Sequence, residues 1–342
     1  MRHAPISFAS IVLVCLKGTA VAADTPPPQQ QHSYRYYVTG NPADVQRPTR
    51  GLFVLQGGGD DVDRNYSHMG EMGGGGDFVV LRASNSDEYN DYIYKLCKCD
   101  SVETLVIDTR EAAADPFVID KVRNAEALWI SGGDQGDYIK SWKDTPLEDA
   151  INFVVAKPAP IGGTSAGMAV GGEFVYSAIG PDSLTSPEGL GDPYHSNLTL
   201  AKDFLKLPGL QGIITDQHLQ ERDRIGRTVT LLARLMKDGY SDHPRAIAAD
   251  RETAVHIDPA TGTAEVFATQ KHKTPYVYFM SVTGPPQQCE RGKPLTMRNV
   301  DVYRIAPGGA RFDLRTWKGQ GGIAYTLSAE NGTLKSSRGE IY

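Results

Sequence analysis

Short apolar runs alternate with longer amphipathic segments through the first two thirds of the chain. The runs hold three or four residues and are Leu52–Leu55, Phe78–Leu81, Leu105–Ile107 and Leu128–Ile130. Amphipathic stretches follow at Tyr89–Cys97, Phe117–Asn124 and Asp137–Ala156. Apolar runs this short, without polar alternation, are typical of strands buried on both faces of a parallel sheet. The pattern predicts an α/β fold, with a mostly parallel sheet flanked by helices on both faces.

The pattern changes after about residue 245. Thr253–Ile257 and Glu265–Phe267 are short strand-like runs joined by an Asp-Pro-Ala-Thr-Gly turn, which predicts an antiparallel hairpin. Similar short runs, such as Val300–Tyr303, continue to the end of the chain. We therefore expect the α/β domain to span residues 46–268 and a β-rich C-terminal extension to span residues 269–342.

The N-terminal residues have the pattern of an export signal. Arg2 precedes the apolar run Ala4–Leu16, and Ala20-Val21-Ala22 offers a small-x-small cleavage site. Residues 1–22 are therefore predicted to be a signal peptide, which implies a secreted or periplasmic protein. The segment 23–45 begins with proline and glutamine runs and is predicted to be a flexible lead-in.

Composition is that of an ordinary globular protein, with 40% hydrophobic and 22% charged residues. Removal of residues 1–22 takes away Arg2 and Lys17, so the formal net charge moves from −6 to −8. Such an acidic chain has no broad electrostatic basis for binding nucleic acid or an anionic membrane. We expect neither as a partner once the signal is cleaved. The sequence leaves the oligomeric state open, a homodimer included.

Three cysteines remain after the predicted signal: Cys97, Cys99 and Cys289. The Cys97-Lys-Cys99 spacing differs from that of the common zinc pairs, and no Cys/His cluster follows it. We expect no metal and no cofactor. In an oxidising compartment, one of the first two cysteines is expected to pair with Cys289, and the sequence does not decide which.

The strongest chemical signal is Gly163-Thr164-Ser165-Ala166-Gly167, which follows a predicted strand and precedes a predicted helix. A serine on such a sharp turn has its hydroxyl clear of the backbone, and the flanking glycines avoid collision with neighbouring elements. The backbone N–H of Ala166 is the natural first donor to an oxyanion. Gly133, on a second glycine turn after another predicted strand, is the candidate second donor.

A serine nucleophile needs a base within hydrogen-bond reach. His218 is the best placed histidine, because it follows the apolar run Ile213–Ile214. His195 is the main alternative, but it lies in a stretch rich in glycine, proline and serine that has no strand to fix it. His68, His243 and His256 are expected to be structural or surface residues.

These segments together resemble peptidase family S51 and the cyanophycinases within it, a branch of the class I glutamine-amidotransferase-like α/β fold. The matching pieces are Gly57-Gly58-Gly59, Gly132-Gly133-Asp134-Gln135, Gly162 to Gly167, and Asp216-Gln217-His218 with Arg222, Arg224 and Arg227. Their order and spacing fit across roughly residues 50 to 268.

The resemblance implies that Ser165 is the nucleophile and His218 the general base. It also implies a substrate pocket lined by Gln135, Asp216, Gln217, Arg222, Arg224 and Arg227. Cyanophycinases cut the poly-aspartate backbone of cyanophycin, whose side chains each carry an arginine, and release β-aspartyl-arginine dipeptides without a metal or cofactor. The expected partner is therefore a peptide polymer or a dipeptide.

The acid that orients the histidine is where the sequence departs from the family. Cyanophycinases typically carry it in a segment Asp-Glu-x-Thr-Ala, whereas this chain has Asp250-Arg251-Glu252-Thr253-Ala254. A one-residue step on a strand turns a side chain to the opposite face, so Glu252 can serve only if a bulge re-aims it. Glu252 is the predicted acid and Asp250 the second candidate. Met168, where the family usually has alanine, is a milder change.

Three functions fit these observations. The first is a cyanophycinase-like exopeptidase that acts outside the cytoplasm, which the three arginines after His218 favour. The second is a dipeptidase for aspartyl or isoaspartyl peptides. The third is a catalytically weakened binding protein that keeps Ser165 and His218 without a working acid.

Overall fold

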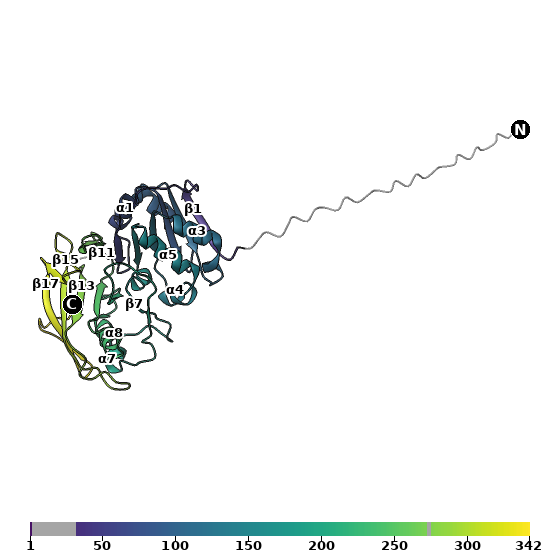
Figure 1. Ribbon diagram of the computed structural model, residues 1–342. Helices are drawn as coiled ribbons and strands as arrows, with labels where there is room; N and C mark the ends of the chain where they lie inside the picture. The colour runs from purple at the N-terminus through teal and green to yellow at the C-terminus, as the bar shows by residue number, and fades with distance from the viewer. Residues whose placement is uncertain (2–31, 272–274) are drawn as a thin grey trace. The chain divides into compact units, whose positions relative to one another are not determined.

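The computed structural model describes residues 32–271 and 275–342, together with Met1. The segment expected to be a signal peptide, beyond Met1, and the first part of the lead-in lie outside the described residues. Within the described ranges, no helix combines the length and the apolar character that a membrane span requires. Two sheets and the helices around them make up this part of the chain (Figure 1).

The first sheet contains the strands that the apolar runs predicted. In spatial order its strands are β1 (Arg35–Gly40), β4 (Ser101–Val106), β3 (Asp77–Arg82), β5 (Ala127–Ile130), β6 (Ile161–Thr164), β2 (Phe53–Gln56), β11 (Thr253–Asp258), β12 (Thr263–Ala268), β15 (Arg311–Asp313) and β16 (Lys318–Gln320). Strands β4, β3, β5, β6 and β2 are parallel, and the outer strands pair antiparallel.

The parallel strands are buried on both faces, as their uninterrupted apolar runs predicted. Phe53 and Leu55 belong to one hydrophobic core, and Leu52 and Val54 belong to another. Helices α3 (Pro116–Asn124) and α5 (Pro146–Ala156) contribute to the first core, and α1 (Asp63–Met72) and α2 (Asn90–Cys97) contribute to the second. Because residue side chains alternate along a strand, each strand stabilises both layers. The α/β prediction is confirmed.

The second sheet carries the β-rich C-terminal part of the chain. Its order is β18 (Thr333–Ser336), β17 (Ile323–Glu330), β14 (Met297–Ile305), β13 (Val277–Val282), β10 (Arg245–Ala249), β9 (Ile213–Asp216), β7 (Phe174–Tyr176) and β8 (Leu200–Lys202). Strand β9 runs parallel to β10 and β7, and the other pairs are antiparallel. The predicted β-rich C-terminal region is confirmed.

The remaining helices lie close to the ends of the strands. They are the short 3₁₀ helix η1 (Ala112–Ala114), α4 (Gln135–Ser141), α6 (Ala166–Ala169), α7 (Ser186–Gly191) and α8 (Ile225–Lys237). Pro187 at the second position and a capping box between Thr185 and Glu188 start α7. Helix α4 begins directly after Gly132-Gly133-Asp134, and α6 begins directly after Ser165. Both turns belong to the site described below.

One expectation about the chain's organisation differs from the structure. Residues 35–40, expected within a flexible lead-in, form β1, which pairs antiparallel with β4. The residues after 268 add strands to the preceding region, because β13 pairs with β10 and β15 pairs with β12. The C-terminal strands thus extend both sheets of the preceding region.

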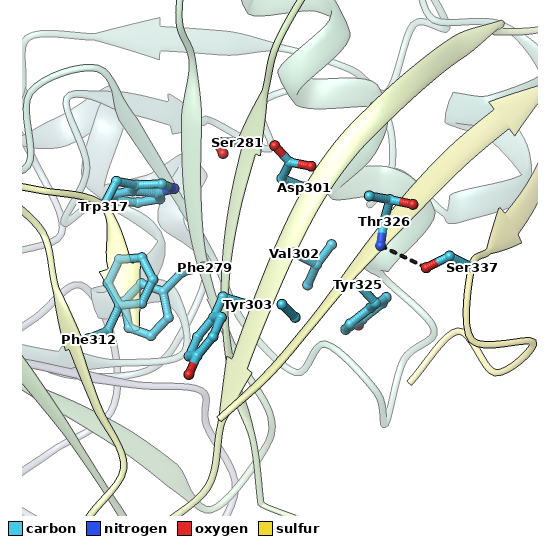
Figure 2. A pocket seen from close by; sticks show the side chains of 11 residues that line it. Phe279, Ser281, Asp301, Val302, Tyr303, Phe312, Trp317, Tyr325, Thr326 and Ser337 are labelled. Carbon is cyan, nitrogen blue, oxygen red and sulfur yellow. Dashed lines mark hydrogen bonds between the residues drawn. The ribbon is translucent and has the colours of Figure 1, made fainter. Parts of the chain in front are cut away.

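A cluster of aromatic rings joins the two sheets near the C-terminal strands (Figure 2). Phe279 of β13 stacks on Phe312 of β15 with ring centroids 3.8 Å apart, and Trp317 meets Phe312 edge-on at 5.0 Å. These rings border a surface cavity of about 380 Å³. Aromatic pairs in this geometry contribute packing energy beyond the area they bury.

The cysteine pairing also differs from the expectation. Cys97 and Cys99 form a disulfide with each other, at the end of α2 and the turn after it. Cys289 is a free thiol and is buried. The disulfide therefore closes a very short loop, and Cys289 takes no part in it.

We expect Phe312→Ala to lower the free energy of unfolding by about 3–5 kcal/mol, since it removes a buried ring at the junction of the sheets. Phe153→Ala is the matched control, because the side chain of Phe153 is 41% exposed, and its loss is expected to be about 1 kcal/mol or less. Urea denaturation of both variants measures the difference. Equal losses would show that the stack does not join the sheets.

Candidate active site

Ser165 lies on a sharp turn between β6 and α6. Its backbone adopts φ 52° and ψ −111°, a conformation that non-glycine residues rarely take and that is concentrated at functional sites. The N–H of Ser165 donates to the carbonyl of Gln56 at the end of β2, at 2.9 Å. The neighbouring parallel strand thus fixes the strained turn and holds the serine hydroxyl clear of the backbone.

The glycines that flank Ser165 are required by their surroundings. A Cβ on Gly163 would lie 2.8 Å from the carbonyl oxygen of Ile130 and would also overlap the backbone of Gly167. A Cβ on Gly167 would overlap the same Ile130 oxygen. The prediction that a side chain at these positions would collide with adjacent elements is confirmed.

His218 meets Ser165 across the two sheets. It follows β9 by two residues, and its Nε2 lies 3.0 Å from the Oγ of Ser165, although the residues are 53 positions apart. The N–H of His218 donates to the carbonyl of Gly57 at 2.9 Å. A Cβ on Gly58 would overlap the imidazole, so a glycine is needed for the ring to reach Ser165.

The carboxylate against His218 is that of Glu221. Its Oε2 lies 2.6 Å from the Nδ1 of His218, one turn further along the same loop. Glu221 therefore occupies the position that the sequence analysis assigned to Glu252. A carboxylate there favours the tautomer with the proton on Nδ1, which leaves Nε2 free to accept the serine proton.

Both acids that the sequence analysis considered are engaged elsewhere. Glu252 lies between Arg251, at 2.5 Å, and the hydroxyl of Thr269, at 2.9 Å. Asp250 accepts the backbone N–H groups of Gln220 and Tyr276 at 3.0 and 3.1 Å. Residues 251 and 252 lie in the turn before β11, with φ of 54° at Glu252, and the Glu252 carboxylate bonds to Arg251 and Thr269.

The environment of His218 favours a neutral imidazole. Burial lowers the pKa of His218 below its usual value of 6.5, and Arg222 and Arg224 act in the same direction, while the hydrogen bond to Glu221 opposes them. Burial raises the pKa of Glu221, but the hydrogen bond with His218 and the charge of Arg251 outweigh it and hold that pKa below its usual range. At neutral pH the pair is therefore a neutral imidazole backed by a carboxylate, as a general base requires.

A polar cavity of about 330 Å³ opens beside Ser165. Four of the residues that the resemblance assigned to the substrate pocket line it: Gln135, Gln217, Arg222 and Arg224. Burial lowers the pKa of Arg224 to about 10, with the neighbouring Arg227 as the next cause. The guanidinium of Arg224 donates to the side-chain oxygen of Gln217 at 2.5 Å, which orients that amide in the wall.

Asp216 and Arg227 do not line the cavity. They form a buried ion pair between β9 and α8, to which the hydroxyl of Thr228 adds a bond at 2.8 Å. Burial raises the pKa of Asp216, but Arg227 outweighs it and holds the pKa below its usual range. The ring of Tyr176 lies 4.8 Å from the guanidinium. These two residues therefore fix the elements beneath the cavity.

The two candidate oxyanion donors both belong to segments that adjoin Ser165. Ala166 is the first residue of α6, directly after the serine. A Cβ on Gly132 would lie 3.6 Å from the Cβ of Ser165, and Gly133 lines the same cavity as the serine. Their role as donors stays a prediction.

The structure adds a wall that the sequence analysis did not include. Ala178, Gly180, Pro181, Asp182 and Ser183 line the cavity. Two side chains from the following loop fix this segment, since Thr199 accepts the N–H of Ile179 at 3.2 Å and Asn197 accepts that of Asp182 at 3.1 Å. The only sequence signal was the cluster Gly180-Pro181-Asp182-Ser183, which indicated a loop without showing where it lies.

His195, His68 and His256 have hydrogen-bond partners other than Ser165. His195 accepts the N–H of Asn197 at 3.3 Å and so helps to fix the same loop. His256 bonds to His68 at 2.9 Å and to Asn65 at 2.8 Å. Within residues 32–271 and 275–342, no group of three or more His, Cys, Asp or Glu side chains is arranged to hold a metal ion.

Comparison with known proteins agrees with the resemblance. The model of peptidase family S51 matches residues 80–190, a range that includes Ser165 and ends before His218. A cyanophycinase of Trichormus variabilis is 28% identical over 225 residues, which cover 65% of this chain and 68% of that protein. A cyanophycinase of a Nostoc species matches with the same identity and coverage.

One solved structure supports the fold. The crystal structure of a peptidase from an acI-B1 actinobacterium aligns with a TM-score of 0.50 at 16% identity, and the alignment covers 69% of this chain and 96% of that one. At this identity the likeness concerns the arrangement of strands and helices alone.

We expect Glu221→Gln to slow the reaction of Ser165 with a fluorophosphonate by on the order of 10²–10⁴-fold, because the imidazolium loses its carboxylate and the tautomer is no longer fixed. Glu252→Gln is the comparison variant and is expected to change the rate by less than about fivefold, the scale of a weakened ion pair whose arginine partner is 41% exposed. Mass spectrometry of labelled Ser165 against time gives both rates. The opposite ranking would return the role to Glu252.

Proposed function

We propose that this chain is a serine-type exopeptidase of peptidase family S51 that hydrolyses cyanophycin and releases β-aspartyl-arginine dipeptides. The observation that carries the proposal is the contact of Ser165 Oγ with His218 Nε2 at 3.0 Å, backed by Glu221 at 2.6 Å. Nucleophile, base and orienting acid are then consecutive members of one hydrogen-bonded chain.

In the proposed reaction, Oγ of Ser165 attacks the carbonyl carbon of a backbone amide while His218 takes the hydroxyl proton. The tetrahedral intermediate collapses, and His218 gives that proton to the departing amine. A water molecule then attacks the ester carbonyl, with His218 again accepting a proton. Ser165 recovers its proton when the acid product leaves.

The charges in the cavity favour a substrate that carries both signs. Arg222 and Arg224 line one part of it, and Asp134 and Asp182 supply carboxylates elsewhere in the lining. Arginine binds carboxylates through paired N–H donors, and carboxylates bind guanidinium groups in the same way. Cyanophycin presents both a carboxylate at its end and a guanidinium on every residue, so its terminal unit is complementary to this cavity.

Secretion or periplasmic location is also part of the proposal. Its support is the export pattern of residues 1–22 in the sequence. The disulfide between Cys97 and Cys99 is compatible with an oxidising compartment. Cyanophycin met there would be polymer released from other cells.

Two alternatives remain from the sequence. The dipeptidase uses the same residues on a smaller substrate. The weakened binding protein was favoured only by the displaced acid, and the carboxylate of Glu221 against His218 removes that argument. We therefore retain the dipeptidase as the second candidate.

We expect the purified protein to dissolve insoluble cyanophycin and to release β-aspartyl-arginine, identified by mass spectrometry, whereas Ser165→Ala releases none. The same preparations are given β-aspartyl and α-aspartyl dipeptides separately. Turnover of dipeptides with no loss of polymer would replace the proposal with the dipeptidase. Turnover of neither would leave a binding protein.

A second expectation concerns Asp182. Its Oδ1 accepts the N–H of Ser183 at 2.7 Å, and an asparagine oxygen can keep that bond. Asp182→Asn should therefore remove the charge without opening the loop, and should raise KM for the arginine-bearing polymer about tenfold, the loss of one charge-assisted contact.

Asp137→Asn, on α4 and outside the cavity lining, is the matched control. Steady-state kinetics on cyanophycin preparations with arginine or lysine side chains measure both variants. An unchanged KM in Asp182→Asn would show that the guanidinium does not bind at this wall.

A further inference from the structure

Glu221 is held at both ends of its carboxylate. Oε2 lies 2.6 Å from His218, and Oε1 lies 3.7 Å from the Nη1 of Arg251. The Glu221 side chain is 35% exposed and that of Arg251 is 41% exposed. The acid behind the imidazole is thus reached by solvent, unlike the deeply buried acid of a typical triad.

An exposed glutamate does not keep one position on a single hydrogen bond. Its side chain has three rotatable bonds, and fixing them costs conformational entropy, while water competes for the free oxygen. A second anchor on the opposite oxygen restricts this motion. Arg251 is the residue that supplies it.

Arg251 is itself fixed from behind. Its Nη2 lies 2.5 Å from Oε1 of Glu252, whose other oxygen accepts the hydroxyl of Thr269 at 2.9 Å. The N–H of Glu252 donates to the carbonyl of Gly58 at 2.5 Å. A Cβ on Gly59 would lie 3.1 Å from Arg251 Nε and from Glu252 Cγ, so the glycine leaves room for the pair.

We propose that Arg251 is a positioning residue for the reaction, which acts by holding Glu221 against His218. The proposal rests on the proposed function, in which Ser165 and His218 are nucleophile and base. The hydrogen-bonded and ion-paired series then runs from Ser165 through His218, Glu221 and Arg251 to Glu252. Glu252, which the sequence predicted as the orienting acid, instead holds Arg251, and Arg251 in turn contacts Glu221.

The direction in which the pKa of His218 moves in an Arg251 variant distinguishes a positioning role from the simple loss of a positive charge near the imidazole. The groups that face His218 are Glu221, Arg222 and Arg224 from its own loop, Ser165 from the β6 turn, and the uncharged Gly57 and Gly58 from the β2 turn. Loss of a cation alone would stabilise the imidazolium and raise its pKa. Loosening of Glu221 would destabilise the imidazolium and lower its pKa.

The experiment measures fluorophosphonate labelling of Ser165 against pH in the full protein, for wild type, Arg251→Ala, Arg251→Lys, Glu221→Gln and the double variant Arg251→Ala/Glu221→Gln. We expect Arg251→Ala to react about tenfold more slowly and its acid limb to move to lower pH. Arg251→Lys should recover to within about threefold of wild type. In the Glu221→Gln background, Arg251→Ala should change the rate by less than about twofold.

Arg311→Ala is the matched control, because Arg311 forms an exposed pair with Glu265 at 2.7 Å away from the site. Its rate should equal that of wild type, and melting curves check that all variants fold. An acid limb that moves to higher pH in Arg251→Ala, or equal effects of Arg251→Ala with and without Glu221, would overturn the proposal.

The labelling data, taken with the cyanophycin assay above, separate this proposal from the proposed function. If wild type labels at Ser165 and Arg251→Ala matches it in rate and pH profile, only the role of Arg251 fails. If the variants of Arg251 and Glu221 show the expected rates and pH shifts but cyanophycin stays intact, the proposed substrate is wrong and the role of Arg251 holds. If wild type does not label at Ser165, the nucleophile is wrong and the role of Arg251 falls with it.

Discussion

Three consecutive carbonyl groups at the end of β2 determine the geometry of the site. Those of Gln56, Gly57 and Gly58 accept the backbone N–H groups of Ser165, His218 and Glu252. Ser165 follows a strand of the first sheet, whereas His218 follows a strand of the second, so no single sheet could align them. All three acceptor residues lie within one turn, and their spacing therefore sets the separation of the Ser165 hydroxyl and the His218 imidazole. Gln56 is buried, and Asn65 donates to its side chain at 2.6 Å, which fixes the turn in its place.

This turn explains the conformations of the residues it binds. Ser165, His218 and Glu252 all have φ between 51° and 54°, a region that costs a non-glycine residue of order 1–3 kcal/mol. The hydrogen bonds to β2 offset this cost at each position. The turn itself must be glycine where the imidazole crosses it, because a Cβ on Gly58 would overlap the ring. The positive φ angles of these three residues and the glycines of the turn after β2 therefore belong to the same structural arrangement.

Sequence patterns predicted the buried strands and the Ser165–His218 pair, because both depend on local signals: an apolar run, then a turn with the right residues. The acid could not be found in the same way. Glu221 is three residues from His218, but whether such a neighbour reaches the ring depends on how the turn after β9 bends, and that depends on Asp250, which binds the N–H of Gln220. The edge strand β1 was missed for a related reason, since its pairing with β4 joins segments far apart in the chain.

The arginines after His218 show how one motif serves different physical purposes. Arg227 is buried against Asp216. Removal of either partner of such a buried pair leaves an uncompensated charge and strongly destabilises the fold. The ion pair fixes the end of β9 against α8. Gln217 and His218 follow directly after β9 and therefore start from a fixed position. Arg224 precedes Arg227 by three residues; it donates to Gln217, and burial lowers its pKa, while Arg222 is exposed and lines the cavity. The same residue type therefore anchors the strand, orients the cavity wall and, at Arg222, supplies an exposed charge to the cavity; the degree of burial distinguishes these three positions.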